Sequence, residues 1–376
     1  MFTSPRWRMV LIGAMAQVFG GWFVGQAAEV GSPTYRLDEV IELAMQHNPG
    51  MAEVQAKLAY VRGQQIAAGA YLNPSISAQS GRGAIRDPSS SVAVIERAVT
   101  VEQPVEWMGK RRSRMQAAEA GLAGAQAGVE EAQLNIMAEV KIAFYQLLLA
   151  QRDVELAKQN LATVEELAQV VRTRVSAGEA ARFDILKADV EVQKARKELA
   201  RAKNEVSMAR AGLNAVTGWG LGQAFRIEGD FEVLDRKLDL DALISRKLEQ
   251  HPTSRRFHKV LEQAEHKVSL ERESLIPNVS FQGTYHREAG DEAWLAGLSV
   301  RVPLWYQRQG EILSAVAEKR RAEAESRMVR NELVKSVVQY AQKVQTAQAQ
   351  IEVFEKGLLK QAEEALRIVR LSLREG

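Results

Sequence analysis

Histidines and carboxylates are the side chains of this chain that could bind a metal ion, and their spacing does not favour such a site. Of the five histidines, His258 and His266 come nearest to a ligand pair, two turns apart on one predicted helix, and no third ligand stands beside them. The chain has no cysteine, and so no thiolate ligand, thiol nucleophile or disulfide. The segment GRGAIR from Gly81 lacks the strand before it and the helix after it that a dinucleotide site requires. We therefore expect no metal, no cofactor and no catalytic site.

A run of cations, KRRSR at 110–114, could contact nucleic acid or lipid headgroups. The chain carries 50 Lys and Arg against 47 Asp and Glu, a formal net charge of +3, and so small an excess is no sign of a nucleic-acid partner. The run stands between a predicted strand and a long predicted helix. We expect it at the boundary of a membrane, where the strand leaves the lipid.

The first residues form a separate segment. Arg6 and Arg8 precede the apolar run MVLIGAMAQVFGGWFVG, and small residues stand at Gly25 and Ala27. This order is typical of a secretory signal peptide, which we place at residues 1–27. An N-terminal membrane anchor is the alternative, although the run is near the short limit for a membrane-spanning helix.

Two copies of one unit follow. The segment LDEVIELAMQHNP from Leu37 matches LDALISRKLEQHP from Leu240, and the match continues to Gly178, whose counterpart is Gly376. We divide the chain into a first copy at 28–217, a linker at 218–237 and a second copy at 238–376.

The longest element of the first copy is a predicted helix. Residues 110–177 contain no proline, and apolar side chains recur every three or four residues from Leu122, Ala125 and Val129 to Val175. This is a heptad seam with one stutter. At 1.5 Å per residue such a helix is about 100 Å long, which an ordinary globular domain does not need.

The same periodicity returns after Gly178 and continues to Leu213, so we predict an antiparallel helical hairpin at 110–217. In the second copy, the long helix at 310–375 has no returning leg before the sequence ends. We interpret this as a missing C-terminal return helix, lost by truncation of the sequence, and a naturally shortened tunnel is the alternative.

Each copy also has a predicted pair of strands, at 75–103 and at 278–302, in which apolar and polar residues alternate. The predicted lipid-facing side chains of the second pair are Phe281, Tyr285, Leu298 and Val300. The predicted lumen-facing side chains are Ser280, Gln282, Ser299 and Arg301. A strand of about nine residues is roughly 30 Å long and could cross an outer membrane, but a half-buried hairpin of a soluble protein has the same alternation.

Four strands per chain limit any membrane assembly. Four strands cannot close a barrel, and an open sheet edge is not tolerated in lipid, so several copies must share one barrel. Three copies would give about twelve strands around a polar lumen, and the same copies would join their helical hairpins into a longer tube.

Several features together resemble the TolC-type outer-membrane efflux proteins: the duplicated order of elements, HNP at 47–49 and VSAGEAARFDIL at 175–186. The segment VEQPVEWMGKRRSRMQAAEA at 101–120 is similar to the heavy-metal branch of that family, the cobalt-zinc-cadmium type. The resemblance extends over about residues 35–376. It implies a mainly α fold with a small β part: duplicated long antiparallel coiled-coil hairpins, and four β-strands per chain in a trimeric 12-stranded transmembrane barrel joined to an α-helical periplasmic tunnel.

The resemblance also implies a location and partners. These are a homotrimer in the outer membrane of a Gram-negative bacterium, in contact with outer-membrane lipid and extending into the periplasm, with a periplasmic adaptor, an inner-membrane pump and no nucleic acid. The implied function is a passive exit duct of a tripartite efflux system, with heavy-metal cations as one class of substrate.

The tip of the first hairpin is the part that the resemblance assigns to the adaptor. The expected contact residues are Gly178, Ala180, Arg182 and Asp184. From the residue types, Gly178 is a turn residue, and Asp184 is either the cap of the returning helix or a carboxylate at a cation-attracting entrance.

Two other functions are alternatives to this one. A periplasmic coiled-coil adaptor of an export system has one helical hairpin between lipoyl-like β halves, whereas this sequence predicts two copies with two strand pairs. An exported enzyme has no support, because no catalytic constellation, phosphate loop or ligand cluster is present in the sequence.

Overall fold

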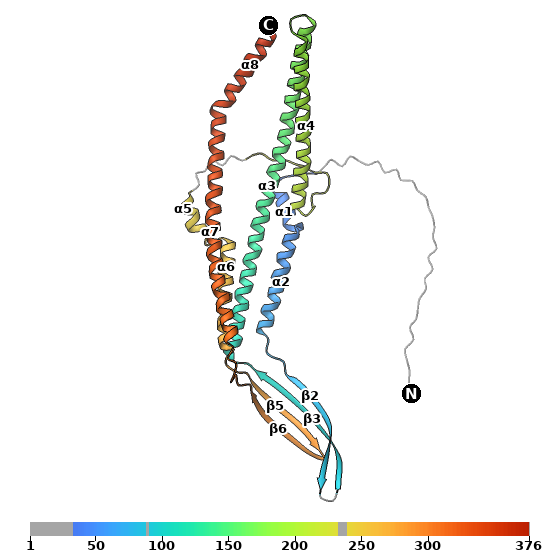
Figure 1. Ribbon diagram of the computed structural model, residues 1–376, viewed down its shortest axis with the longest axis vertical. Helices are drawn as coiled ribbons and strands as arrows, with labels where there is room; N and C mark the ends of the chain where they lie inside the picture. The colour runs from blue at the N-terminus through green and yellow to red at the C-terminus, as the bar shows by residue number, and fades with distance from the viewer. Residues whose placement is uncertain (1–32, 88–89, 232–238, 376) are drawn as a thin grey trace, which may run out of the picture.

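The structure is a computed structural model in which residues 33–87, 90–231 and 239–375 are described. The molecule is elongated, with a four-stranded sheet at one end and a helical tip at the other (Figure 1). The expected signal peptide at 1–27 lies outside the described residues. Residues 232–238, which include the end of the linker at 218–237, lie outside them as well.

The first copy begins with short helices and continues into the long hairpin. Its elements are β1 (Thr34–Tyr35), α1 (Leu37–His47), α2 (Pro49–Gly69), β2 (Ser75–Asp87), β3 (Ser90–Val105), α3 (Met108–Ser176), α4 (Arg182–Val216) and β4 (Arg226–Ile227). Of these, α3 has 69 residues and is continuous, as the absence of proline predicts.

The second copy repeats the order of helix, strand pair and long helix. Its elements are α5 (Leu240–Ala242), a π-helical turn at Leu243–Lys247, α6 (Pro252–Glu273), β5 (Val279–Glu288), β6 (Asp291–Val300), α7 (Gln309–Val353), a π-helical turn at Phe354–Leu358 and α8 (Leu359–Glu375).

The second long helix differs from the single helix expected at 310–375. The N–H of Leu359 donates to the carbonyl of Phe354, five residues back. This turn therefore contains one residue more than a turn of α-helix, in which the bond spans four residues. Gly357 stands within the turn, and its low helix propensity favours a break there. Figure 1 shows α8 inclined to α7 beyond this point.

Where α3 leaves the sheet it packs between α2 and α6 (Figure 1). The buried side chains there are small, at Ala117, Ala120, Gly124 and Ala127. The seam expected through Leu122, Ala125 and Val129 is half-buried instead, because α6 covers the neighbouring stripe of α3. Small residues at this contact let the two helix axes approach closely.

The largest apolar core lies at mid-length, where α1, the middle of α3 and the end of α4 meet β4. Val40, Phe144, Leu147 and Leu213 are fully or almost fully buried in it. Asn48 caps α2 through Gly50 and also donates its side-chain N–H to the carbonyl of Val216 at 2.7 Å, which ties the short helices to α4. This core holds the sheet and the hairpin in one rod.

The four-stranded sheet has the order β2-β3-β5-β6, and all of its pairs are antiparallel. The two hairpins, one from each copy, meet where β3 pairs with β5, and the hydroxyls of Thr100 and Thr284 are 2.9 Å apart across that pair. The outer edges of β2 and β6 pair with no other strand of the described chain. Among the described helices, none is both long and apolar enough to span a membrane.

Candidate functional surfaces

The two faces of the sheet have opposite chemistry. The register pairs Phe281 with Leu298 and Ser280 with Ser299. Directly paired residues of an antiparallel sheet project to the same face, and neighbours along a strand project to opposite faces. The side chains expected to face lipid therefore share one face, and Ser280, Gln282 and Ser299 share the other. The expected lumen residue Arg301 lies just beyond the end of β6.

The first of these, the apolar face, exposes large hydrophobic side chains from all four strands. They are Ile76, Ile95, Val99, Val101, Val105, Phe281, Trp294, Leu298 and Val300. Leu298 is 69% exposed, and an apolar surface of this extent needs an apolar environment. The rings of Tyr285 and Trp294 lie 4.9 Å apart on the same face.

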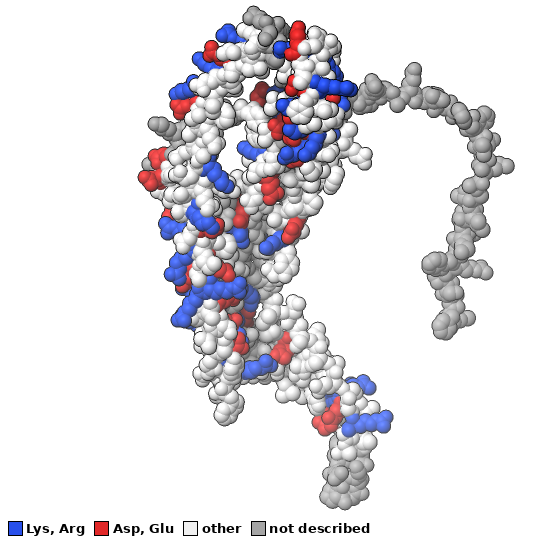
Figure 2. Space-filling view, turned by 45° about the horizontal axis from the view of Figure 1, so that its top comes forward, with Lys and Arg blue, Asp and Glu red and all other residues white. Residues whose placement is uncertain are grey.

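A row of charged side chains crosses the apolar face toward its far end, and Ile95 of β3 lies beyond this row. Arg97 pairs in register with Arg287, and Arg287 forms an ion pair with Glu292 at 3.7 Å. Figure 2 shows a charged cluster near the far end of the sheet and few charges between it and the helices.

The second face, the polar face, carries charge of one sign. Among the strand residues whose side chains are described, those that are ionised on this face are Glu96, Glu102, Glu288 and Asp291. No Lys or Arg of the described strand residues projects to it. Within the same set, Val94 and Leu295 are large apolar side chains on this face. The alternation in the sequence predicts Glu102 on this face, but not its combination with Glu96, Glu288 and Asp291, because the pairing of β3 with β5 joins residues almost two hundred positions apart.

The tip of the α3–α4 hairpin brings the four expected contact residues together. Gly178 has φ = 81°, which favours glycine, and the turn ends at Ala181. The N-cap of α4 is Ala181, and Asp184, at the third position of the helix, accepts the N–H of Ala181 at 3.2 Å, as the third residue of a capping box does. Phe183 beside it is 61% exposed, and its ring lies under Lys187. The tip therefore presents an apolar ring among charges.

The KRRSR run lies at the junction between the helices and the sheet. Arg114 binds both oxygens of Glu106 at 2.7 Å and the carbonyl of Ala68 at 2.9 Å. Lys110 donates to Asn278 at 2.8 Å, and burial lowers its pKa. Arg111 donates to the carbonyl of Gly69 at 2.7 Å. Three of the four cations thus form hydrogen bonds or ion pairs within the chain, whereas Arg112 is exposed to solvent.

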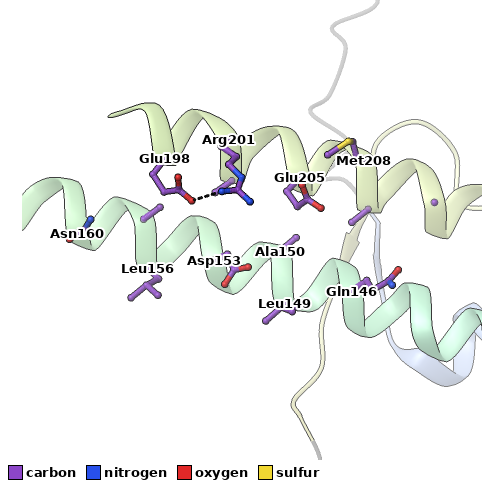
Figure 3. Close-up of a pocket in the computed structure, with 14 residues that line it drawn as sticks. Gln146, Leu149, Ala150, Asp153, Leu156, Asn160, Glu198, Arg201, Glu205 and Met208 are labelled. Carbon is purple, nitrogen blue, oxygen red and sulfur yellow. Dashed lines mark hydrogen bonds and ion pairs between the residues drawn. The ribbon is translucent and has the colours of Figure 1, made fainter. Parts of the chain in front are cut away.

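A groove of about 790 Å³ follows the seam between α3 and α4 (Figure 3). Asp153 from α3 and Glu198 and Glu205 from α4 line it, and Glu198 is 3.5 Å from Arg201. Within the described ranges, no three His, Cys, Asp or Glu side chains come close enough to hold a metal ion, here or elsewhere. The groove therefore lacks the ligand set that a resident ion needs.

Comparison with known proteins gives a consistent result. A family model described as outer membrane efflux protein matches residues 40–219 and 243–376, which is most of the chain. The cobalt-zinc-cadmium resistance protein CzcC of Cupriavidus metallidurans is 27% identical over 275 residues, 73% of this chain and 66% of that protein. The nickel-cobalt-cadmium resistance protein NccC of Alcaligenes xylosoxydans is 25% identical over 82% of this chain and 69% of its own length. This chain thus spans about two thirds of the length of these relatives.

Solved structures share the fold. The chain aligns with CusC, a transmembrane channel, with a TM-score of 0.76 and 14% identity, over 90% of this chain and 82% of the other. It aligns with the outer membrane protein VceC of Vibrio cholerae with a TM-score of 0.74 and 19% identity, over 90% and 86%. The expected fold class, mainly helical with a small β part, is confirmed.

Proposed function

The chain belongs to the outer membrane efflux protein family, and we propose that it is the outer-membrane duct of a tripartite efflux system that exports divalent metal cations. Its location is the outer membrane, with the helices extending into the periplasm. The family match covers both copies, so the alternative of a periplasmic coiled-coil adaptor is abandoned.

The proposed assembly is a homotrimer that closes a twelve-stranded barrel. Its support is the sheet, whose two free edges would be unpaired in lipid unless a second copy covers them. The apolar face then contacts lipid, and the polar face lines the lumen. From Val279 to Tyr285 the apolar face extends about 20 Å along the strand, and Arg287 can extend its guanidinium from the end of that band into the headgroups.

The acidic polar face is the observation that carries the choice of cations. Glu102 lies near the helical end of the sheet, whereas Glu96, Glu288 and Asp291 lie at about the same level, at the end of β5 and β6 that is farther from the helices. A trimer would repeat these carboxylates three times around one lumen. Rings of carboxylates attract cations and repel anions in a pore. The names of the relatives, which are resistance proteins for cobalt, zinc, cadmium and nickel, agree with this substrate class.

Ion selectivity in planar lipid bilayers tests the proposal. The trimer is inserted under a salt gradient, and the reversal potential gives the ratio of cation to anion permeability. We expect a preference for cations that falls severalfold in the double variant Glu96→Gln, Glu102→Gln. Glu292→Gln removes the same charge from the apolar face and should leave selectivity unchanged. An anion-selective wild-type channel, or equal effects of both variants, would contradict the proposal.

The remaining partners of the proposed system are the periplasmic adaptor and the inner-membrane pump. We assign the adaptor contact to the tip residues Gly178, Ala180, Arg182 and Asp184, with Phe183 as an apolar anchor. The support is the exposure of Phe183 at the end of the hairpin that lies farthest from the sheet (Figure 1).

A further inference from the structure

A cleft of about 750 Å³ opens where α2 leads into β2 and β3 leads into α3. Its lining includes Tyr71, Leu72, Gln103, Val105, Met108 and Arg112. We propose that this cleft binds one anionic phospholipid of the periplasmic leaflet, with its phosphate at Arg112 and an acyl chain along Met108 and Val105. The inference rests on the proposed function in one respect, that the sheet lies in the membrane.

The apolar part of the cleft is continuous with the apolar face of the sheet. Gln103 and Val105 are the last residues of β3 that project to that face, in register with Phe281 and Val279. Met108 is 83% exposed and Tyr71 is 77% exposed, although both line the cleft. An acyl chain that follows the apolar face to its helical end would therefore pass directly onto Val105 and Met108. Burial of these side chains is the favourable term for binding.

The cationic part of the cleft lies beside this apolar path. The guanidinium of Arg111 is 4.4 Å from the ring centroid of Tyr71, and its Nε is buried without an acceptor among the described atoms. Arg112 makes no hydrogen bond or ion pair with any residue that the structure describes. A guanidinium with free donors binds a phosphate through two parallel N–H groups.

Two carboxylates, Glu106 and Glu119, line the same cleft, and neither cancels the charge at Arg112. Both oxygens of Glu106 are taken by Arg114 at 2.7 Å. Glu119 lies two turns further along α3 from Arg112, about 10 Å away along the helix axis. The mouth of the cleft therefore presents positive charge next to an apolar floor, which is the pattern of a headgroup site for an acidic lipid.

A second copy of the chain is the other candidate occupant, and the geometry disfavours it. A neighbouring copy in a closed barrel would extend the sheet from the edges of β2 and β6, within the plane of the sheet. The cleft instead includes residues that project out of that plane on the apolar face. Lipid is what contacts this face in the proposed assembly.

Native mass spectrometry of the full-length trimer tests the site. The trimer is transferred to micelles and titrated with phosphatidylglycerol as the anionic probe and phosphatidylethanolamine as the zwitterionic one. We expect up to three tightly retained phosphatidylglycerol molecules per trimer, and at least a fivefold loss of their retention in Arg112→Gln. Arg112→Lys should restore part of the retention. Arg62→Gln removes an exposed, unpaired cation of α2 and should change nothing.

A second variant tests the apolar path. Met108→Glu places a charge where the acyl chain would lie and should reduce retention of both lipids. Equal retention by wild type and Arg112→Gln, or no preference for the anionic lipid, would overturn the proposal. So would a cross-link to a neighbouring subunit from a photoactivated reagent on Met108→Cys, because it would show that a second copy fills the cleft. Bilayer conductance of the same Arg112→Gln trimer should match wild type; a chain that forms no channels at all would fail the proposed function instead.

Discussion

At the scale of single residues, alternation along the strands carries most of the functional information. The sequence predicts which side chains share a face, because the period of a strand is two whatever its partner. It predicts Glu102 on the polar face with Ser280, but it does not predict that Glu96, Glu288 and Asp291 lie together at one end of that face, because that depends on the register between the two copies. The acidic character of the polar face therefore emerges only from the paired sheet.

A charge on the apolar face should be costly. We expect Leu298→Arg to lower the free energy of unfolding from lipid vesicles by about 2–4 kcal/mol if Leu298 lies near the midplane, because the guanidinium must leave water. Ser299→Arg, one residue along on the polar face, should cost under about 1 kcal/mol. Urea titration of both variants measures the difference. Equal costs would show that the two faces have the same environment.

A partly buried ion pair should matter more than the exposed ones. Glu131 of α3 accepts from Thr253 at 3.0 Å and from Arg256 at 3.3 Å, and its side chain is only 17% exposed. We expect Glu131→Ala to cost about 1–3 kcal/mol, since it leaves Arg256 without its acceptor. Glu191→Ala breaks an exposed pair with Lys194 on α4 and should cost at most about 0.5 kcal/mol. The free energies of unfolding of the two variants measure this difference, and equal losses would contradict the prediction.

At the scale of elements, the sequence locates the long helices well and their contacts poorly. The absence of proline and the Gly178 break predict α3 and α4 to within about three residues of the observed bounds. The contact of α3 with α6 was not predicted, because a heptad seam says that a stripe is buried but not which helix covers it. The π-helical turn at Phe354–Leu358 was also missed, since no proline marks it.

Close packing of α3 against α6 should depend on its glycines. A Cβ at Gly124 would lie 3.4 Å from the Cβ of Lys259, so Gly124→Leu must push α6 away and should cost about 1–3 kcal/mol. Gly212 of α4 has no such neighbour within 4 Å, and Gly212→Leu should be neutral or stabilising through helix propensity. Thermal unfolding followed by circular dichroism compares the two. A Gly124→Leu chain as stable as the Gly212→Leu chain would show that the contact is loose.

The hairpin tip should be the element that meets the adaptor. The chain has no cysteine, so Ala180→Cys introduces a single site for a photoactivated cross-linker. In cells that express the cognate pump and adaptor, we expect a cross-link to the adaptor from Ala180→Cys and none from Ala296→Cys in the sheet. The opposite pattern would reverse the orientation of the molecule in the envelope.

At the scale of the whole molecule, the free edges of β2 and β6 make one chain incomplete. β2 runs away from the helical end of the sheet and β6 runs toward it, so β2 of one copy beside β6 of the next would run antiparallel, like every other pair in the sheet. Parity then restricts which residues meet, because paired side chains share a face. Ser77 of the polar face can meet Ser299 or Gly297 of the next copy, and it cannot meet Leu298.

Disulfide trapping tests this closure, with the cysteine-free chain as background. We expect one of the double variants Ser77→Cys with Ser299→Cys, or Ser77→Cys with Gly297→Cys, to form covalent oligomers on mild oxidation, with the shear of the barrel deciding which. The ladder on denaturing gels should stop at three chains, because a closed ring leaves no free edge for a fourth. The pair Ser77→Cys with Leu298→Cys is the control and should stay monomeric on the gel, since its thiols would lie on opposite faces. A ladder that continues past three, or equal trapping by the control, would mean that the edges pair in an open array, and the duct as proposed here could not form.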